Sequence, residues 1–473
     1  MQKHFLLMLF FILFAAQSFA IELSLAPGLS IKNLYLYAML ATLAMNAARA
    51  QAQLNYNTTQ KFGSEGQEST SLRGLHIAYS VFAFYALLSM LVVIGMFMDK
   101  DYDALTSVMT FKSNLLDRYL FFLVFFFGLT SFKDAVWLIK AILVIFILGN
   151  SITLMDALDM PDLGIIHQRD DGRVSGPMGE SNQYGAFLVM FLPLSAYIVF
   201  VTRGFQRLFF GFGFLMSFGV LLLAASRGAM VGLTLALLII TALEWKHISK
   251  KYFFPATVGL FVVGALIIVI VASQSEGLLT ERFLDSSGGY GSSARSISSG
   301  RTEIWSAAIA KMNNSPLSFL FGYGWFSWGA ADDMARLYEN ATKYNMAPHN
   351  SYLAYFFELG LIGLSLFLSV VLIIINYVRK ALNYANNVAK GIILAFLYGF
   401  VALLIAIVFV DLYLPWVYVW SLIGVVVRVA YEMLKQESID PAVEDQPDIE
   451  ANASSPQESE STRKITPPGF QTF

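Results

Sequence analysis

Long apolar stretches recur along most of the chain and are separated by shorter polar segments. Read with a window of about 19 residues, several of these stretches are as long as one bilayer crossing, which takes about 20 predominantly apolar residues in a helix. The pattern predicts about twelve membrane-spanning helices: 5–20, 33–48, 78–97, 114–132, 135–155, 183–202, 206–224, 228–243, 252–273, 350–376, 390–410 and 412–431. The expected fold is therefore all-α, a polytopic transmembrane helical protein.

Two connecting segments differ from the short loops between spans. Segment 156–182 is rich in charge and glycine, and segment 274–349 is the longest connection in the chain. The longer segment begins with a Ser/Gly-rich stretch at 286–300, where turns are expected. It continues with helical periodicity over 304–312, which Pro316 is expected to stop. The predicted regions are N-terminal transmembrane helices (1–155), a second membrane region (156–435) with one large loop containing short helices (274–349), and a disordered acidic tail (436–473).

The positions of Lys and Arg predict the orientation of the spans, because loops that face the cytoplasm carry an excess of both. If the N-terminus is cytoplasmic, the inner loops hold most of the basic residues near span ends, among them Arg203, Arg207, Lys246, Lys250, Arg379, Lys380 and Lys390. Both termini are then cytoplasmic, and segments 156–182 and 274–349 face outward. Residues 1–20 also fit a cleaved signal peptide, in which case residue 21 emerges on the same outer side.

The composition of the chain excludes several classes of protein and several kinds of site. Of the 473 residues, 57% are hydrophobic and 14% are charged, whereas a soluble domain has about 25% charged residues. This composition argues against a folded cytosolic protein, excludes intrinsic disorder for the bulk of the chain and gives no sign of a nucleic-acid partner. The chain has no cysteine, and its five histidines show no metal-ligand spacing, so the sequence predicts no disulfide, no metal and no cofactor.

The candidate functional residues are arginines and a histidine at the outer ends of the predicted spans. Arg227 interrupts an apolar run over 208–243 that is long enough for nearly two crossings, which predicts a tight turn at 226–228. Arg169 and Arg173 lie in the shorter outer segment, and His349 lies where the longer one re-enters the membrane. Taken singly, each has an ordinary structural explanation, such as an arginine reaching lipid headgroups, local ion pairs in a loop, or a histidine at a span boundary.

Taken together, these residues favour a lipid diphosphate as ligand. The arginine guanidinium is planar and permanently charged, and it matches phosphate oxygens with two parallel hydrogen bonds. Several arginines can stabilise a departing diphosphate without a metal, and a nearby histidine can accept the proton of an attacking hydroxyl. Apolar helices beside them can receive the lipid chain.

Four segments in order resemble the O-antigen ligase and polymerase superfamily of bacterial inner-membrane glycosyltransferases. They are Arg173–Gly176 with Glu180–Asn182, Ser226–Ala229, Gly300–Trp305 with Gly322–Gly324, and His349–Leu353 with Glu358–Gly363. The resemblance covers about 165–365 and makes 156–435 the catalytic region. It implies metal-independent, inverting transfer of a glycan from undecaprenyl diphosphate on the periplasmic face of the inner membrane.

The resemblance also implies roles for individual residues. His349 corresponds to the proposed base that activates the acceptor hydroxyl, and Arg173 and Arg227 to arginines that hold the diphosphate. Arg301 matches the Gly-Arg of the loop helix, and Arg169 is included as a neighbour. Supporting roles are expected for the polar residues of the same motifs, Glu180, Asn182 and Asn350.

Several functions share these features. A polysaccharide polymerase and a ligase use the same donor and differ in the acceptor, which is a glycan or a lipid core. A protein O-oligosaccharyltransferase transfers to Ser or Thr, and a lipid-linked oligosaccharide flippase or other transporter is the alternative from another class. A transporter is expected to show repeat symmetry and charges at the membrane midplane, whereas the candidate residues gather at one face. The leading prediction is an O-antigen or exopolysaccharide polymerase or ligase, whose partners could include other polysaccharide-assembly proteins.

Overall fold

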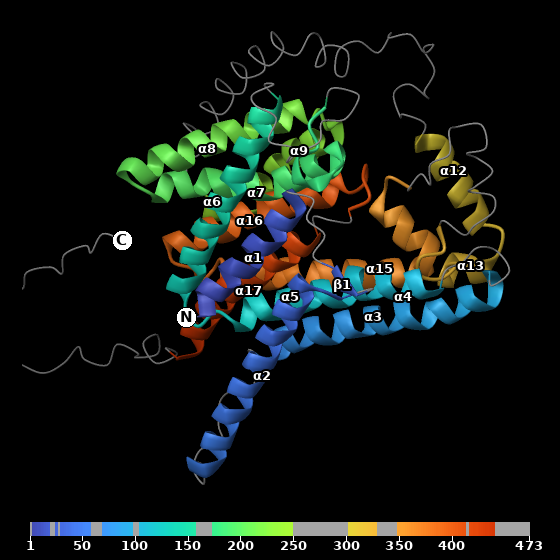
Figure 1. The fold of residues 1–473 in the computed structure, drawn as a ribbon, viewed down its shortest axis with the longest axis horizontal. Helices are drawn as coiled ribbons and strands as arrows, with labels where there is room; N and C mark the ends of the chain where they lie inside the picture. The colour runs from blue at the N-terminus through green and yellow to red at the C-terminus, as the bar shows by residue number, and fades with distance from the viewer. Residues whose placement is uncertain are drawn as a thin grey trace, which may run out of the picture.

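The computed structural model describes most of the chain as helices packed side by side (Figure 1). The residues it describes are 2–18, 24–26, 29–57, 69–97, 104–157, 173–248, 301–328, 348–412 and 416–439. Within them, β1 (Ser24–Ala26) and β2 (Leu29–Ser30) form a small antiparallel pair, and the other regular elements are helices. The predicted all-helical class is confirmed for these residues.

The first half of the chain provides eight helical elements among the described residues. They are α1 (Gln2–Ser18), α2 (Ile31–Asn57), α3 (Ser69–Phe97), α4 (Ala104–Phe111), the π-helix η1 (Lys112–Leu116), α5 (Asp117–Phe127), α6 (Phe132–Ala157) and the 3-10 turn η2 (Gly176–Met178). The second half of the chain, in its described part, provides α7 (Ser181–Val201), α8 (Gly204–Leu223), α9 (Arg227–Leu243), η3 (Trp245–His247), α12 (Arg301–Met312), α13 (Pro316–Phe321), α15 (Ser351–Ala381), α16 (Asn387–Ala406) and α17 (Trp416–Ile439).

Seven helices in the described part of the chain are long and apolar enough to cross a membrane. They are α3, α6, α7, α8, α15, α16 and α17. Two further apolar helices, α1 and α9, are shorter. The predicted span at 252–273 lies outside the described residues, so the total of about twelve stays a prediction.

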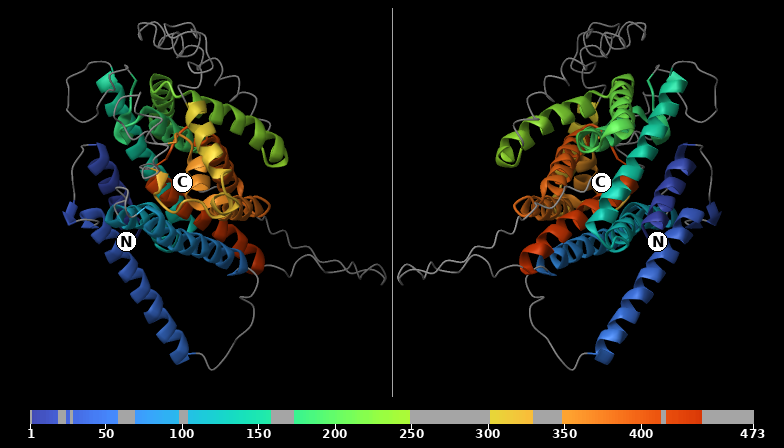
Figure 2. Two further views of the ribbon diagram at one scale, coloured as in Figure 1. Left: turned by 90° about the vertical axis from the view of Figure 1, so that its right-hand side faces the viewer. Right: turned by 90° about the vertical axis from the view of Figure 1, so that its left-hand side faces the viewer.

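Two predicted spans differ from the helices that the structure contains. The expected span 33–48 falls within α2, which leaves the bundle along its length in Figures 1 and 2 and is mostly exposed where its side chains are described. The expected span 114–132 is divided between η1 and α5, with the π-helix interrupting the regular helix at Lys112–Leu116.

Helices of the second half of the chain pack on one another and on helices of the first half. Helix α16 packs against α9 and α7, α17 packs against α5, and α15 packs against α3. An ion pair between Arg379 Nε and Glu244 Oε1 (2.5 Å) joins the ends of α15 and α9. Helix α15 starts at Ser351, next to His349, and α9 starts at Arg227. The ion pair joins the opposite ends of these two helices, so it lies at the end of the bundle remote from the candidate arginines and histidine.

A break in α15 receives the chain that follows α13. Gly360 has a φ of +65°, so the helix divides there, and the carbonyls before the break lack helical partners. The backbone N–H of Gly324 donates to the carbonyl of Glu358 at 2.7 Å, and the N–H of Tyr323 donates to that of Phe357 at 3.0 Å. A Cβ added at Gly322 would lie 2.4 Å from the Glu358 carbonyl oxygen. The glycines of the two predicted motifs therefore permit a backbone-to-backbone contact.

Candidate functional site

Arg173 lies just before η2, and its guanidinium is held by two elements. The side chain is 5% exposed, its Nε donates to the carbonyl of Ala224 at 3.0 Å, and its NH2 group donates to Oδ1 of Asn182 at 3.0 Å. Ala224 follows α8, and Asn182 lies in the first turn of α7. Two bonds from different atoms of one planar group fix the plane of the guanidinium.

Glu180 and Asn182 form the support of Arg173. Glu180 is the N-cap of α7, and its carboxylate accepts from the backbone N–H groups of Asn182 (3.1 Å) and Gln183 (2.8 Å). The same carboxylate accepts from the side-chain amide of Asn182 at 2.7 Å. This bond orients the Asn182 amide so that its oxygen faces Arg173. The predicted supporting residues are therefore linked in a chain from Glu180 through Asn182 to Arg173.

Arg227 is the first residue of α9, directly after a tight turn. Ala225 has a φ of +46°, and Ser226 is buried. The turn packs closely on α7, since a Cβ added at Gly185 would lie 2.6 Å from Cβ of Ser226. A tight turn does divide the apolar run, as predicted, but it lies at 224–226 rather than at 226–228, since Arg227 and Gly228 already belong to α9. The Arg173–Ala224 bond joins Arg173 to this turn, directly before Arg227.

His349 and Asn350 form the start of α15. Asn350 is its N-cap, and its Oδ1 accepts from the N–H groups of Tyr352 and Leu353, both at 3.0 Å. His349 has a φ of +50°, in the left-handed region that non-glycine residues seldom adopt. Such a conformation persists where surrounding contacts hold it, and it sets the direction in which the imidazole leaves the backbone.

Asp411 provides the contacts that hold His349. One carboxylate oxygen accepts from the backbone N–H of His349 at 2.5 Å, and the other accepts from the N–H of Asn350 at 2.9 Å. Asp411 is 4% exposed and lies in the segment between α16 and α17. Sequence reasoning missed this residue, although the signal was present as a lone acid between the apolar stretches 390–410 and 412–431.

Burial raises the pKa of Asp411 to about 7. The two backbone N–H donors act in the opposite direction, Glu180 adds to the rise, and Arg301 opposes it. Burial dominates because it removes water from the charged form of the carboxyl. The interactions also show that Glu180 and Arg301 both lie within electrostatic range of the carboxylate that holds His349.

Arg301 begins α12, which packs on the first half of α15. Trp305 donates its indole N–H to the carbonyl of Pro348 at 2.9 Å, directly before His349. The predicted periodicity is confirmed in part, because Ile304, Ala308 and Met312 are buried against Leu353 and Phe357, whereas Ile309 is 46% exposed. The expected role of Pro316 as the stop of this helix is wrong. The helix ends at Met312, and Pro316 follows the N-cap Ser315 as the first residue of α13, a position that suits its fixed φ.

One segment, 407–412, connects these parts of the site. The N–H of Ser351 donates to the carbonyl of Ile407 at 2.9 Å, and the Ser351 hydroxyl donates to that of Val410 at 3.0 Å. A Cβ added at Gly228 would lie 2.7 Å from Cβ of Phe409, so the start of α9 packs on the same segment. Arg173, Arg227, Arg301 and His349 are therefore brought to one end of the bundle, and Arg169 lies outside the described residues.

Metal-binding geometry does not appear among the residues that the structure describes. No group of three or more His, Asp or Glu side chains there could hold a metal ion. The charges that the described residues bring to this end include guanidinium groups and the carboxylates of Glu180 and Asp411. Such a set is suited to an anion with several oxygens, since arginine offers paired N–H donors.

The helices and the site define a multi-pass membrane protein with a cationic, partly buried site at one end of its bundle. Residues 211–368 match the family model of O-antigen ligase. The protein thus carries an O-antigen ligase domain, which confirms the family resemblance seen in the sequence and implies glycan transfer. The match runs from α8 into α15, and it includes Arg227, Arg301 and His349 but not Arg173 or Asp411. No curated protein matches the chain.

Proposed function

We propose that the protein is an integral membrane glycosyltransferase that moves a glycan from undecaprenyl diphosphate to an acceptor hydroxyl on the periplasmic face. The observation that carries this proposal is the contact of one segment, 407–412, with both the start of α9 at Arg227 and the start of α15 at His349. Cationic groups and a potential base then share one end of the bundle, as transfer from a lipid diphosphate requires.

The diphosphate is held by Arg173 and Arg227, with Arg301 contributing from α12. Cleavage of the sugar–phosphate bond develops negative charge on the leaving diphosphate, and guanidinium groups stabilise this charge more than they stabilise the ground state. The buried Arg173, with its plane set by Ala224 and Asn182, needs little reorganisation as the charge develops. Positive charge from arginine supports a metal-independent reaction.

His349 acts as the base. The acceptor oxygen attacks the anomeric carbon while its proton passes to the imidazole, and the bond to the phosphate oxygen breaks with its electron pair on the diphosphate. Attack from the side opposite the leaving group inverts the anomeric configuration. A positioned base of this kind contributes typically ~10²–10⁴ in rate.

Asp411 is a positioning residue in this mechanism. Its two oxygens bind successive backbone N–H groups, and so hold His349 in the left-handed conformation from which the imidazole projects. Asn350 fixes the next turn as N-cap, and Glu180 holds the Asn182–Arg173 pair on the other side. These supporting residues orient the base and the cations without contacting the reacting atoms.

Release of undecaprenyl diphosphate from the lipid-linked donor tests the function. Membranes containing the His349→Ala protein should release none, because the acceptor hydroxyl loses its base, whereas His247→Ala at the far end of α9 should match the unaltered protein. Expression and membrane insertion are expected to stay normal in both. Normal release by His349→Ala protein would show that the base has been misassigned.

Two further experiments address the finer parts of the proposal. Transfer by purified protein should persist in EDTA, and complete loss that a divalent ion restores would contradict metal independence. Deleting the gene distinguishes the acceptors. Capped short chains on lipopolysaccharide indicate a polymerase, free lipid-linked polymer indicates a ligase, and loss of glycan from proteins indicates an O-oligosaccharyltransferase.

The periplasmic orientation is also testable, because the chain contains no cysteine. Single cysteines introduced at exposed positions report their side of the membrane through an impermeant thiol reagent. Thr302→Cys, at the start of α12, should react in intact spheroplasts, and Arg203→Cys, between α7 and α8, should react after lysis. The opposite result would place the site in the cytoplasm.

A further inference from the structure

Helix α13 exposes its apolar residues and buries a polar one. Four of its six residues are large, apolar and exposed: Leu317, Phe319, Leu320 and Phe321. Leu317 is the most exposed of them, at 69%. The hydroxyl of the buried Ser318 is directed inward and lies 2.9 Å from the carbonyl oxygen of Ser315 and 3.1 Å from that of Met312. A helix that faces water has the opposite arrangement, so the outer face of α13 is suited to an apolar medium.

Helix α12, which precedes α13, has the arrangement expected of a helix beside water. Ile304, Ala308 and Met312 are buried against α15, and the exposed residues include Thr302 and Ser306 as well as Ile309. Polar residues predominate in the link between the two helices, which contains Lys311, Asn313, Asn314 and Ser315. This link, 311–315, therefore separates a surface suited to water from a surface suited to lipid.

Lys311 and Tyr323 meet at this link. Nζ of Lys311 lies 5.5 Å from the centroid of the Tyr323 ring, and the Tyr323 hydroxyl donates to the carbonyl of Lys311 at 3.0 Å. Both residue types are typical of a membrane–water interface, because each combines an apolar body with a polar end that reaches water. The contact supports a boundary between water and lipid at 311–315.

The depth of α13 is set by its contacts with α3. The Tyr85 hydroxyl of α3 lies 3.2 Å from the carbonyl oxygen of Phe321, the last residue of α13. The backbone N–H of Trp325 donates to Oγ of Ser89 at 3.0 Å. Tyr85 and Ser89 belong to the apolar stretch Leu72–Leu91, which is long enough to cross a membrane. At about 1.5 Å per residue they lie about 9 and 3 Å before the end of that stretch, so α13 lies beside the span and not beyond it.

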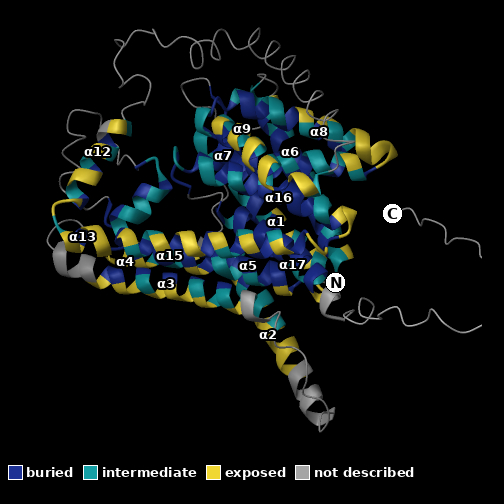
Figure 3. Cartoon of the chain, turned by 180° about the vertical axis from the view of Figure 1, so that it is seen from behind, coloured by how far each residue is buried: buried dark blue, intermediate teal, exposed yellow. Residues whose placement is uncertain are grey.

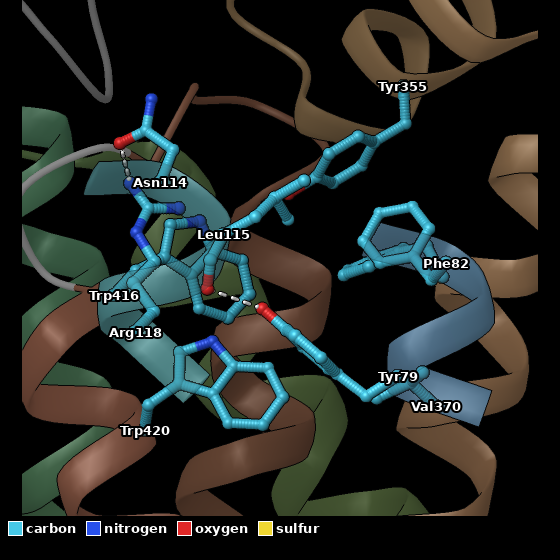
Figure 4. Close-up of a pocket in the computed structure, with 10 residues that line it drawn as sticks. Tyr79, Phe82, Asn114, Leu115, Arg118, Tyr355, Val370, Trp416 and Trp420 are labelled. Carbon is cyan, nitrogen blue, oxygen red and sulfur yellow. Dashed lines mark hydrogen bonds between the residues drawn. The ribbon is translucent and has the colours of Figure 1, made fainter. Parts of the chain in front are cut away.

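Helix α3 has one face inside the bundle and another outside it. Figure 4 shows Tyr79 and Phe82 among the residues of the interior. The ring centroid of Tyr79 lies 5.2 Å from that of Trp420, and the centroid of Phe82 lies 5.9 Å from that of Tyr355. The outer face of the same helix exposes a row of large apolar residues: Val81, Phe84, Leu87, Leu88 and Leu91. In a membrane-spanning helix this outer face contacts acyl chains.

The exposed face of α13 continues the lipid-facing surface of α3 and α15. Helix α13 packs on α15, and α15 packs on α3. Helix α15 exposes Leu361, Leu368 and Leu372, whose spacing places them on one side of the helix. Figure 3 shows exposed residues of α13, α15 and α3 in one view. Because α3 and α15 are both candidate membrane spans, the medium that covers their outer faces also covers α13.

The backbone of α13 has partners of the kind that a medium without water requires. Ser315 caps the first turn by accepting from the N–H of Leu317 at 3.2 Å, and Pro316 has no N–H that needs a partner. At the other end, the N–H of Gly322 donates to the carbonyl of Ser318 at 2.8 Å. Backbone groups at membrane depth must be paired within the protein, so these contacts are consistent with a lipid environment.

We propose that α13 is inserted among the acyl chains of the leaflet at the candidate-site end of the bundle, with the boundary between water and lipid at 311–315. Three observations select lipid as the occupant of its apolar face: the reversed polarity of the helix, its depth beside α3, and the continuity of its surface with two candidate spans. The inference does not depend on glycan transfer. Its structural consequence is that α12, which carries Arg301, is anchored at a fixed height relative to the acyl chains.

Fluorescence quenching tests this proposal, because the chain contains no cysteine and accepts a label at one chosen position. Leu317→Cys is labelled with bimane in the purified full-length protein, which is then reconstituted into phosphatidylcholine vesicles that carry doxyl groups on their acyl chains. The bimane should lose most of its fluorescence to the doxyl lipid and little to iodide added to the water. Leu320→Cys provides a second probe on the same helix and should behave in the same way.

Two matched controls define the extremes of the measurement. Leu88→Cys, on the outer face of α3 at the same depth, should be quenched by the doxyl lipid to the same extent as Leu317→Cys. Ser306→Cys, on the exposed side of α12, should be quenched by iodide and not by the lipid. Quenching of Leu317→Cys and Leu320→Cys by iodide would place α13 in water and overturn the proposal. Shielding of both positions from both quenchers would also overturn it, and a disulfide between two Leu317→Cys copies would then identify a second copy of the chain as the cover.

Discussion

Substitution of Asp411 by asparagine tests how His349 is positioned while leaving the imidazole of His349, the proposed base, unchanged. The carboxylate accepts from the N–H groups of His349 and Asn350, and the asparagine side chain has nearly the same shape. Its NH2 group is a donor and cannot accept, so one backbone N–H loses its partner. A hydrogen bond to a charged group contributes about 1.5–3 kcal/mol, and a left-handed non-glycine residue costs about 1–3 kcal/mol.

The free energy lost with the hydrogen bond is similar to the cost of the left-handed conformation, so in Asp411→Asn that conformation of His349 should no longer be the dominant one. Each 1.4 kcal/mol changes a population about tenfold, and we expect kcat to fall about 10- to 100-fold in Asp411→Asn. The KM for the lipid-linked donor should change less than about twofold, because Arg173 and Arg227 keep their contacts. The assay is the release of undecaprenyl diphosphate from membranes that contain the acceptor.

A structural defect would give a different result from a positioning defect. Asp134→Asn, near the start of α6, removes an acid that is paired with Lys3 at 2.6 Å and serves as the matched control. It should retain normal kcat. Unchanged kcat in Asp411→Asn, or a rise in donor KM with kcat preserved, would refute the role of Asp411 in positioning His349.

Three other substitutions or conditions give further tests. Arg227→Lys replaces a planar donor pair with a point charge and should lower transfer at least about tenfold, and full activity would exclude a bidentate phosphate contact there. Gly360→Ala should destabilise the fold or the loop contact strongly, because an added Cβ lies 2.3 Å from the Leu320 carbonyl oxygen and φ is +65°, whereas Gly74→Ala, with open space around it, should be tolerated in a thermal-shift assay. Asp411 should make stability fall as pH rises from about 4 toward 7, since the folded state binds the proton more tightly. The difference between 3.8 and about 7 corresponds to at most about 4 kcal/mol, and Asp411→Asn should abolish this dependence in pH-dependent unfolding.

The parts of the site that could be predicted from the sequence follow from the length of an apolar run and from the position of a residue at the boundary of a span. The turn before Arg227 was predictable because an apolar run over 208–243 is too long for one crossing and contains one charge. His349 was found because it stands where a long polar loop re-enters the membrane. Neither argument needs knowledge of which helices are neighbours.

The parts that sequence missed depend on contacts between distant segments. Arg173 bonds to the backbone of Ala224, and a backbone acceptor leaves no residue signature. Asp411 resembled an ordinary acid at a span boundary, and its importance lies in which N–H groups it meets. Pro316 was expected to end a helix and instead begins one, because Ser315 supplies the N-cap. The interruption at Lys112–Leu116 has no pattern of hydrophobic residues that distinguishes it from a regular helix.

Imaging the full-length protein with bound undecaprenyl diphosphate tests the central claim most directly. The account predicts density for the diphosphate between Arg173 and Arg227, with the imidazole of His349 facing the position where the sugar would be attached. Diphosphate density at any site that leaves these two arginines and His349 without contact would contradict it.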